Sequence, residues 1–219
     1  MTEQFFICGC IRSGTSFFCD MFTDFVQEIY NECGDINVIN RKKTLADNCF
    51  AMKWCEDYNN KREIFEHFPR SKIILVVRDL RDTLNSIYNP NAKSIPFRNF
   101  PAVEQISVNQ NVSYFEAGLI ILNQYYDDIS KNALDEDEIE IVIYDDICKH
   151  PQQLKDIFDK LFPNNIKDII YYKNKILKTP NQLSYLNWTE AQKTQFKTFN
   201  NGFLNKMLLH FNFENTEDW

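Results

Sequence analysis

The sequence feature that most limits the possible folds is a short apolar run that turns through two glycines into a helix-like segment. The apolar run FFIC covers residues 5–8, Gly9 and Gly14 enclose a polar turn, and apolar residues then recur with helical spacing over residues 15–26. This pattern predicts a strand over residues 4–10, a glycine turn and a helix. Such a strand–helix unit is the building block of parallel sheets, which indicates an α/β chain.

Four later segments have the length and apolar content of further strands. They cover residues 29–32, 48–54, 72–77 and 139–144. Because the stretches between them can form helices, the sequence predicts a three-layer, P-loop-like α/β fold with a central parallel sheet flanked by helices.

The spacing of apolar residues also predicts individual helices. They cover residues 82–88, 112–129 and 189–209, the last beginning at a threonine suited to cap it. Surface loops are predicted over residues 89–101 and 171–188, where the composition is polar and no clear periodicity is present.

Length and composition indicate one ordinary globular domain. The chain has 219 residues, and two domains of half that length would each be short of buried core, so we expect a single domain over residues 1–219. A content of 44% hydrophobic and 25% charged residues excludes a disordered or collagen-like chain. The net charge of -7 argues against a nucleic-acid partner, so any bound anion must be held by local groups.

The sequence also suggests a cytoplasmic location without a membrane partner. No apolar run approaches the roughly 20 residues of a membrane span, and the first strand leaves no room for a signal peptide. The 7 cysteines are an odd number without CxxC pairs or zinc-type Cys/His spacing, which is typical of free thiols in a reducing compartment.

The octapeptide GCIRSGTS, residues 9–16, has the GxxxxG spacing of a phosphate-binding loop. A glycine turn into a helix directs backbone N–H groups at one anion, and Arg12, Thr15 and Ser16 add side-chain donors. Thr15 stands where a nucleotide triphosphatase has lysine, which disfavours ATP hydrolysis and leaves room for a phosphate or phosphosulfate. Taken alone, the octapeptide would more often be a glycine-containing connector that binds nothing.

The loop resembles that of the sulfotransferase family, which uses 3′-phosphoadenosine 5′-phosphosulfate (PAPS) as donor. In that family RSGTS or KSGTT follows the first strand and binds the 5′-phosphosulfate. The matching residues are Arg12, Ser13, Gly14, Thr15 and Ser16.

A second part of the resemblance concerns the donor's 3′-phosphate. The family places on it an arginine at the end of a strand and a serine eight residues later, and Arg78 and Ser86 match this pattern. In open α/β sheets both positions converge on the ligand crevice, and Arg81 is a further candidate there. The alternative role for Arg78 is an ion pair with Asp79 or Asp82.

Two further segments extend the resemblance towards the C-terminus. Tyr144 opens YDDI, which is similar to the family's YEDL segment, where the tyrosine approaches the nucleotide; a strand end capped into a helix is compatible with the same residues. Lys178, in KTPN with Trp188 ten residues later, resembles the loop that closes over the donor in tyrosylprotein sulfotransferases.

The resemblance implies transfer of a sulfuryl group from PAPS to a hydroxyl or amine acceptor, with negative charge building on the departing bridging oxygen. Arg12 is the residue expected to stabilise that charge, since the family has Lys or Arg there. Lys53 resembles a lysine that family members hold beside the sulfate, although a solvated lysine beside Glu56 and Asp57 is an equal alternative. The arginines and backbone donors supply the positive charge, so no metal is expected.

The acceptor hydroxyl also needs a base. His67 and His150 fall in segments with a structural character, whereas Glu32 stands close to the position of the catalytic Glu in tyrosylprotein and related bacterial sulfotransferases. Glu28 and Asp35 are rivals, and Glu32 could equally be an ordinary exposed carboxylate.

The function expected from the sequence is therefore that of a single-domain PAPS-dependent sulfotransferase acting on a small-molecule or other hydroxyl-bearing acceptor. Two alternatives remain open at this point. A P-loop small-molecule kinase would share the fold but should show the missing lysine and an acidic residue for Mg²⁺. A non-catalytic nucleotide-binding protein would keep Arg78 and Ser86 and tolerate loss of Glu32. The sequence predicts neither the acceptor nor the oligomeric state.

Overall fold

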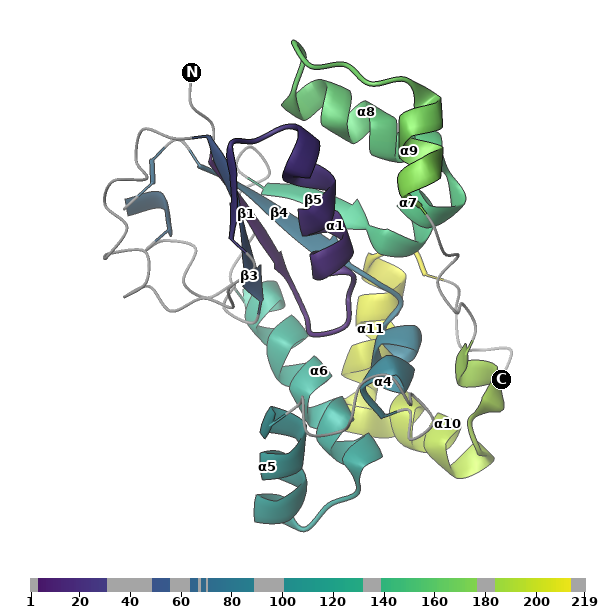
Figure 1. Ribbon diagram of the computed structural model, residues 1–219. Helices are drawn as coiled ribbons and strands as arrows, with labels where there is room; N and C mark the ends of the chain where they lie inside the picture. Colours follow the sequence, from purple (N-terminus) through teal and green to yellow (C-terminus); the bar gives the residue numbers. More distant parts are fainter. Residues whose placement is uncertain are drawn as a thin grey trace. The chain divides into compact units, whose positions relative to one another are not determined.

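The computed structural model describes most of the chain, in two compact units (Figure 1). The described residues are 4–30, 49–55, 64–66, 68–69, 71–88, 101–131, 139–176 and 184–213. The first unit combines Met1–Arg78 with Asn132–Pro180, and the second combines Asp79–Lys131 with Asn181–Trp219.

The first unit contains a sheet of five parallel strands, which confirms the predicted fold class. The strands are β1 (Gln4–Gly9), β2 (Glu28–Tyr30), β3 (Phe50–Cys55), β4 (Ser71–Val77) and β5 (Ile139–Ile143), in the spatial order β2-β3-β1-β4-β5. In the register Gln4 lies opposite Phe50 on one side and Ser71 on the other, so β1 is the central strand. All five predicted strands are present, each within a few residues of its expected ends.

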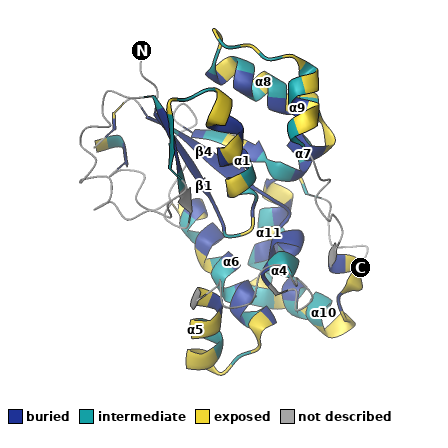
Figure 2. Cartoon of the chain, viewed as in Figure 1, coloured by how far each residue is buried: buried dark blue, intermediate teal, exposed yellow. Residues whose placement is uncertain are grey.

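Helices of the same unit cover one face of this sheet. They are α1 (Thr15–Met21), α7 (Tyr144–Lys149), α8 (Pro151–Leu161) and α9 (Ile169–Lys175), with the short 3-10 helix η1 (Phe22–Asp24) after α1. Phe5 and Ile7 of β1 pack here with Phe18 of α1 and Phe158 of α8 in one apolar cluster. Burying each such side chain stabilises the fold by about 1.5 to 3 kcal/mol. Figure 2 shows β1 and β4 almost wholly buried, which is why both read as continuous apolar runs.

On the opposite face of β1 a second group of rings is buried. Phe6 lies 5.8 Å from Phe50 and 5.4 Å from Phe68, and Phe50 lies 5.6 Å from Phe68, measured between ring centroids. Both faces of the central strand are therefore apolar, as the unbroken run at residues 5–8 predicts.

The second unit is helical in its described residues. It contains α4 (Leu80–Tyr88), α5 (Pro101–Gln110), α6 (Tyr114–Lys131), η5 (Ser184–Asn187), α10 (Glu190–Thr198), η6 (Phe199–Gly202) and α11 (Phe203–His210). α4, α5 and α11 all contact α6, whose inward residues are buried. Within the described part of the chain, no helix is both long enough and apolar enough to cross a membrane.

Three sequence-based boundaries were wrong. The helix predicted over residues 15–26 ends at Met21 and continues as η1. Residues 171–175, predicted as the start of a loop, belong to α9, whose N-cap, Asp168, accepts the backbone N–H of Tyr171 with its side chain. The single helix predicted over residues 189–209 is two helices.

The break between those two helices has a backbone cause. Asn200, Asn201 and Gly202 have φ values of 46°, 55° and 78°, in the left-handed region that glycine and asparagine tolerate best. The predicted start is correct, since Thr189 forms a capping box with Gln192. The predicted loop over residues 89–101 lies outside the described residues except at Pro101, where α5 begins.

Candidate active site

The loop between β1 and α1 depends on its two glycines. A Cβ atom on Gly9 would lie 2.5 Å from Ser13 Oγ and 2.7 Å from the carbonyl oxygen of Val76. Gly14 has φ 101°, and a Cβ atom there would collide with the ring of Tyr144. The glycine spacing identified in the sequence thus reflects two tight contacts, one with β4 and one with the residue after β5.

Ser13 folds into this loop. Its backbone N–H donates to the Cys10 carbonyl at 3.0 Å, and its side chain is fully buried against Gly9. The hydroxyl makes no hydrogen bond to any of the described residues. The backbone of Ser13 therefore stabilises the turn, and its buried hydroxyl remains able to bind a further polar group.

Lys53 lies beside the loop, as the resemblance implied. It stands on β3 opposite Ile7 of the central strand, and its Nζ donates to Ser16 Oγ at 2.7 Å. Two residues predicted to contact the donor are thus brought together by the β1–β3 pairing. The alternative partners considered for Lys53, Glu56 and Asp57, lie outside the described residues.

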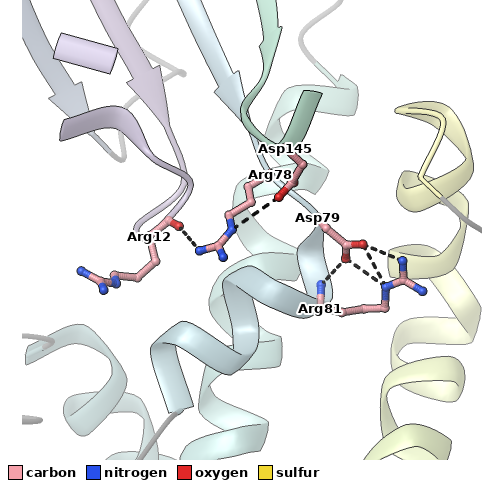
Figure 3. Close-up of polar contacts among 5 residues, drawn as sticks. All are labelled: Arg12, Arg78, Asp79, Arg81 and Asp145. Atoms are coloured by element: carbon pink, nitrogen blue, oxygen red, sulfur yellow. Dashed lines mark hydrogen bonds and ion pairs between the residues drawn. The ribbon is translucent and has the colours of Figure 1, made fainter. Parts of the chain in front are cut away.

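Arg78 follows β4 directly and is nearly buried, with 9% of its surface exposed. Its Nη1 donates to the carbonyl oxygen of Arg12 at 3.4 Å, and its Nε lies 4.0 Å from Asp145 Oδ1 (Figure 3). The guanidinium also lies over the Tyr144 ring, 5.6 Å from its centroid. The residue thus joins the β1–α1 loop to the residues that follow β5.

Arg12 occupies a left-handed backbone position, with φ 66°. Its side chain extends away from the Arg78 guanidinium in Figure 3 and is exposed to solvent. Partial desolvation by surrounding protein atoms, and then repulsion from Arg78, lower the pKa of Arg12. An arginine guanidinium keeps its positive charge in proteins. The positive charges of Arg12 and Arg78 lie close enough to interact, and together they favour an anion at this loop.

Tyr144 packs against the loop from the start of α7. Its ring contacts Gly14, and it lies edge-to-face with Phe17 at 5.6 Å between centroids. Burial, followed by the neighbouring Cys148 thiol, raises the pKa of Tyr144 to about 12. The phenol is therefore neutral at physiological pH, and it offers an aromatic face to Arg78.

Arg81 has a different environment from Arg78. It is 2% exposed, its Nη2 lies 2.5 Å from Asp79 Oδ2, and its guanidinium lies 4.0 Å from the centroid of the Tyr185 ring. Asp79 also accepts the backbone N–H of Arg81 at 2.9 Å and so caps the start of α4. These contacts tie Arg81 to the N-terminus of α4 and to η5, within the second unit.

Ser86 lies half-buried on α4, also in the second unit. Its predicted contact with the 3′-phosphate of the donor stays a prediction.

Three other predicted residues lie outside the described part of the chain, namely Glu32, its rival Asp35, and Lys178. The other rival base, Glu28, is on β2 and accepts a hydrogen bond from the Tyr30 hydroxyl. His150 is exposed at the junction of α7 and α8, which fits its structural reading, and His67 is outside the described residues.

The sequence reasoning missed one member of the site, Asp145. The residue is 5% exposed, and its carboxylate faces Arg78 from the first turn of α7. The signal that could have found it is the acidic residue directly after Tyr144 in YDDI, placed at the end of a strand that neighbours β4.

Comparison with known proteins agrees with this geometry. The model of the sulfotransferase domain family matches residues 2–212. No protein in the curated set matches the chain. Among solved structures, mouse sulfotransferase SULT7A1 complexed with PAP is 13% identical, with a TM-score of 0.61 over 96% of this chain and 88% of that chain.

Two other solved structures have the same fold. The sulfotransferase from Alicyclobacillus acidocaldarius is 12% identical with a TM-score of 0.55, over 98% of this chain and 97% of that chain. The sulfotransferase domain from the curacin biosynthetic pathway is 12% identical with a TM-score of 0.56, over 98% and 99% of the two chains. The family match over nearly the whole length decides between the sulfotransferase and kinase alternatives, and the chain belongs to the sulfotransferase domain family.

Proposed function

We propose that this protein transfers a sulfuryl group from PAPS to a hydroxyl or amine group of an acceptor. The observation that carries the proposal is the arrangement of Arg12 and Arg78 at one loop, with the Arg78 guanidinium bonded to the Arg12 carbonyl at 3.4 Å. Two positive side chains at one loop, of which Arg78 lowers the pKa of Arg12, suit a ligand with several anionic groups.

The residues present fit such a donor. Arg78 Nε is buried and makes no hydrogen bond to the described residues, so part of a charged donor group is unused in this arrangement. In the proposal, PAPS supplies the activated sulfuryl group. Its 5′-phosphosulfate is held by the loop residues Arg12, Ser13, Gly14, Thr15 and Ser16.

The proposed roles of the remaining side chains follow their positions in the chain. Arg78 and Ser86 bind the 3′-phosphate, and Tyr144, whose ring contacts Gly14, provides an apolar face beside the nucleotide. Arg12 and Lys53 offset the negative charge that builds on the bridging oxygen. Lys178 is proposed as a further donor contact from its sequence context alone.

Glu32 is proposed as the base that accepts the proton of the acceptor hydroxyl, in line with the resemblance to Glu-based sulfotransferases. The acceptor is proposed to be a small molecule or another hydroxyl-bearing group. No metal is required in this scheme, because cationic side chains and backbone N–H groups meet the developing charge.

We also propose that residues 1–219 work as one sulfotransferase domain, which the family match over residues 2–212 supports. A cytoplasmic location is proposed as well. The described cysteines form no disulfide bonds, as expected for a reducing compartment; they are Cys8, Cys10, Cys19, Cys49 and Cys148.

Nucleotide binding tests the donor assignment. Titration calorimetry in the presence of EDTA should show 3′-phosphoadenosine 5′-phosphate (PAP) binding much more tightly than ATP. Arg78→Ala should weaken PAP by about 2 to 4 kcal/mol, because a buried guanidinium contact to phosphate is lost. Arg78→Lys keeps the charge and loses the planar fork, so its affinity for PAP should lie between those of wild type and Arg78→Ala.

The matched control is Lys160→Ala, which removes one positive charge from an exposed ion pair with Glu140 on the surface of the first unit. PAP affinity should stay within about 0.5 kcal/mol of wild type in that variant. Equal affinity of the wild-type protein for PAP and ATP would contradict the proposal, because no group would then be recognising the 3′-phosphate.

A further inference from the structure

We propose that Asp145 is a positioning residue that holds the Arg78 guanidinium in the orientation needed to bind the donor's 3′-phosphate, and this inference rests on the proposed function. Asp145 is the second residue of YDDI, and the sequence analysis assigned a role only to Tyr144 in that segment. Its position follows from the sheet, because β5 lies directly beside β4 and both strands end at the same edge.

The guanidinium of Arg78 is restrained on three sides. Nη1 donates to the carbonyl oxygen of Arg12, and Nε faces Asp145 Oδ1 at 4.0 Å (Figure 3). On a third side, the guanidinium lies over the Tyr144 ring, 5.6 Å from its centroid. Nη1 makes a hydrogen bond, whereas Nε faces the carboxylate at 4.0 Å without a hydrogen bond to the described residues. A long arginine side chain loses considerable rotamer freedom when it is fixed, so a structure that fixes it in advance reduces the entropy lost on binding.

A carboxylate is the group that this position requires. Asp145 and Arg78 have side-chain exposures of 8% and 11%, and charges this deeply buried are rarely left unpaired. Arg78 also repels the positive charge of Arg12, and a carboxylate beside Arg78 offsets part of that repulsion. At 4.0 Å, Asp145 is close enough to direct the guanidinium by charge and far enough to leave Nε able to approach another acceptor.

Neighbouring contacts make Asp145 a rigid support. It lies in the first turn of α7, where a carboxylate interacts favourably with the helix N-terminus, and Tyr144 before it is fixed against Gly14. Ile147 and Cys148, which follow it, are buried in the apolar cluster of the first unit. Movement of the Asp145 backbone would therefore require repacking of the loop contact or of the core.

The test compares two nucleotides that differ only in the 3′-phosphate, PAP and adenosine 5′-phosphate. In Asp145→Asn the ratio of their affinities should fall by roughly 3- to 100-fold, the range of coupling between contacting residues. The affinity for adenosine 5′-phosphate should change little. The matched control is Asp146→Asn, which removes the same charge from the neighbouring, less buried position and should leave the ratio unchanged.

A double-variant cycle separates positioning from direct contact. If Asp145 acts through Arg78, Asp145→Asn should have almost no further effect on the ratio in the Arg78→Ala background. A full effect in that background would overturn the proposal and indicate that Asp145 touches the nucleotide itself. An unchanged ratio in Asp145→Asn, or an equal loss of affinity for both nucleotides, would also overturn it.

Folding is checked by thermal unfolding of every variant. If Asp145→Asn does not fold, Asp145→Glu is used instead, because it keeps the charge and displaces it by one methylene group. The proposal then requires a lower ratio of PAP to adenosine 5′-phosphate affinity in Asp145→Glu than in wild type. That decrease should be smaller than the decrease in Arg78→Ala. Failure of the proposed function looks different, because the wild-type protein would then show no preference for PAP over adenosine 5′-phosphate. That result would remove the basis of both proposals.

Discussion

Gly14 is the residue at which backbone conformation and side-chain packing meet most directly. Its φ of 101° and the adjacent Tyr144 ring both exclude a side chain. We expect Gly14→Ala to lower the free energy of unfolding by about 2 to 5 kcal/mol, combining the left-handed backbone cost with overpacking against the ring. Urea denaturation measures the loss.

The two causes can be separated in a Tyr144→Ala background. Removing the ring relieves the overpacking but leaves φ unchanged, so the cost of Gly14→Ala should fall there to about 1 to 2 kcal/mol. An identical cost in both backgrounds would mean that the contact between Gly14 and Tyr144 contributes nothing to the shape of the loop.

Arg12 is expected to matter more during the reaction than in binding. Arg12→Ala should reduce turnover by about 10²- to 10³-fold, the usual loss when one group that stabilises a developing negative charge is removed. PAP affinity should decrease much less. Arg12→Lys should retain part of the turnover. Both variants place a non-glycine residue at φ 66°, so a difference in turnover between them comes from the side chain and not from the backbone. Normal turnover with a raised Michaelis constant in Arg12→Ala would assign Arg12 to donor binding alone.

At the scale of elements, α9 is tied to η1 by a polar contact. The Tyr171 hydroxyl donates to Asp24 Oδ2 at 2.5 Å, and Lys175 Nζ lies 3.0 Å from the same oxygen. The hydrogen bond from Tyr171, and then that from Lys175, lower the pKa of Asp24. Burial, and then the hydrogen bond to Asp24, raise the pKa of Tyr171. The contact is thus strongest with the carboxylate charged and the phenol neutral.

These opposite shifts predict a pH window. Asp24 stabilises the fold above its ordinary pKa near 4, and this contribution is lost as the pH falls through its lowered folded-state pKa. Tyr171 stabilises the fold below about pH 10, and this contribution is lost as the pH rises through its raised pKa. The difference in free energy of unfolding between wild type and Asp24→Asn should therefore be largest between roughly pH 5 and 9.

Urea denaturation at pH 3, 7 and 10.5 measures that difference, with Asp20→Asn as the control at an exposed position on α1. The control should show no comparable maximum near neutral pH. If the difference between wild type and Asp24→Asn is the same at all three pH values, the contact of Asp24 with Tyr171 and Lys175 does not depend on the charge of the carboxylate, and the prediction is wrong.

The elements that the sequence predicted correctly are those whose signal is local. β1 and β4 are continuous apolar runs because both of their faces are buried, and Thr189 caps a helix through residues within one turn. α9 was missed because it has only seven residues, of which Tyr172 alone is buried, so no apolar stripe marks it. Its start depends on one capping side chain in a polar stretch.

At the scale of the whole molecule, the strand order explains which parts of the site could be predicted. The order β2-β3-β1-β4-β5 does not follow the chain, and spacing along the sequence cannot supply it. Lys53 was proposed from its resemblance to a family position, yet its contact with Ser16 follows from the β1–β3 pairing. The pairing of Arg78 with Asp145 likewise requires β5 beside β4, so the sequence offered no partner beyond Asp79 and Asp82.

The central place of β1 also affects how the chain is made. β1 pairs with β3 and β4, so the backbone groups around Gln4 can be paired only after Phe50 and Ser71 have been synthesised. At 5 to 20 residues per second, translation leaves this strand unpaired for on the order of several seconds. During that time the ribosome presents FFIC, a short segment with high β-propensity and no charge, which is the composition that promotes aggregation. We expect this segment to be vulnerable to aggregation until both of its partner strands have been made.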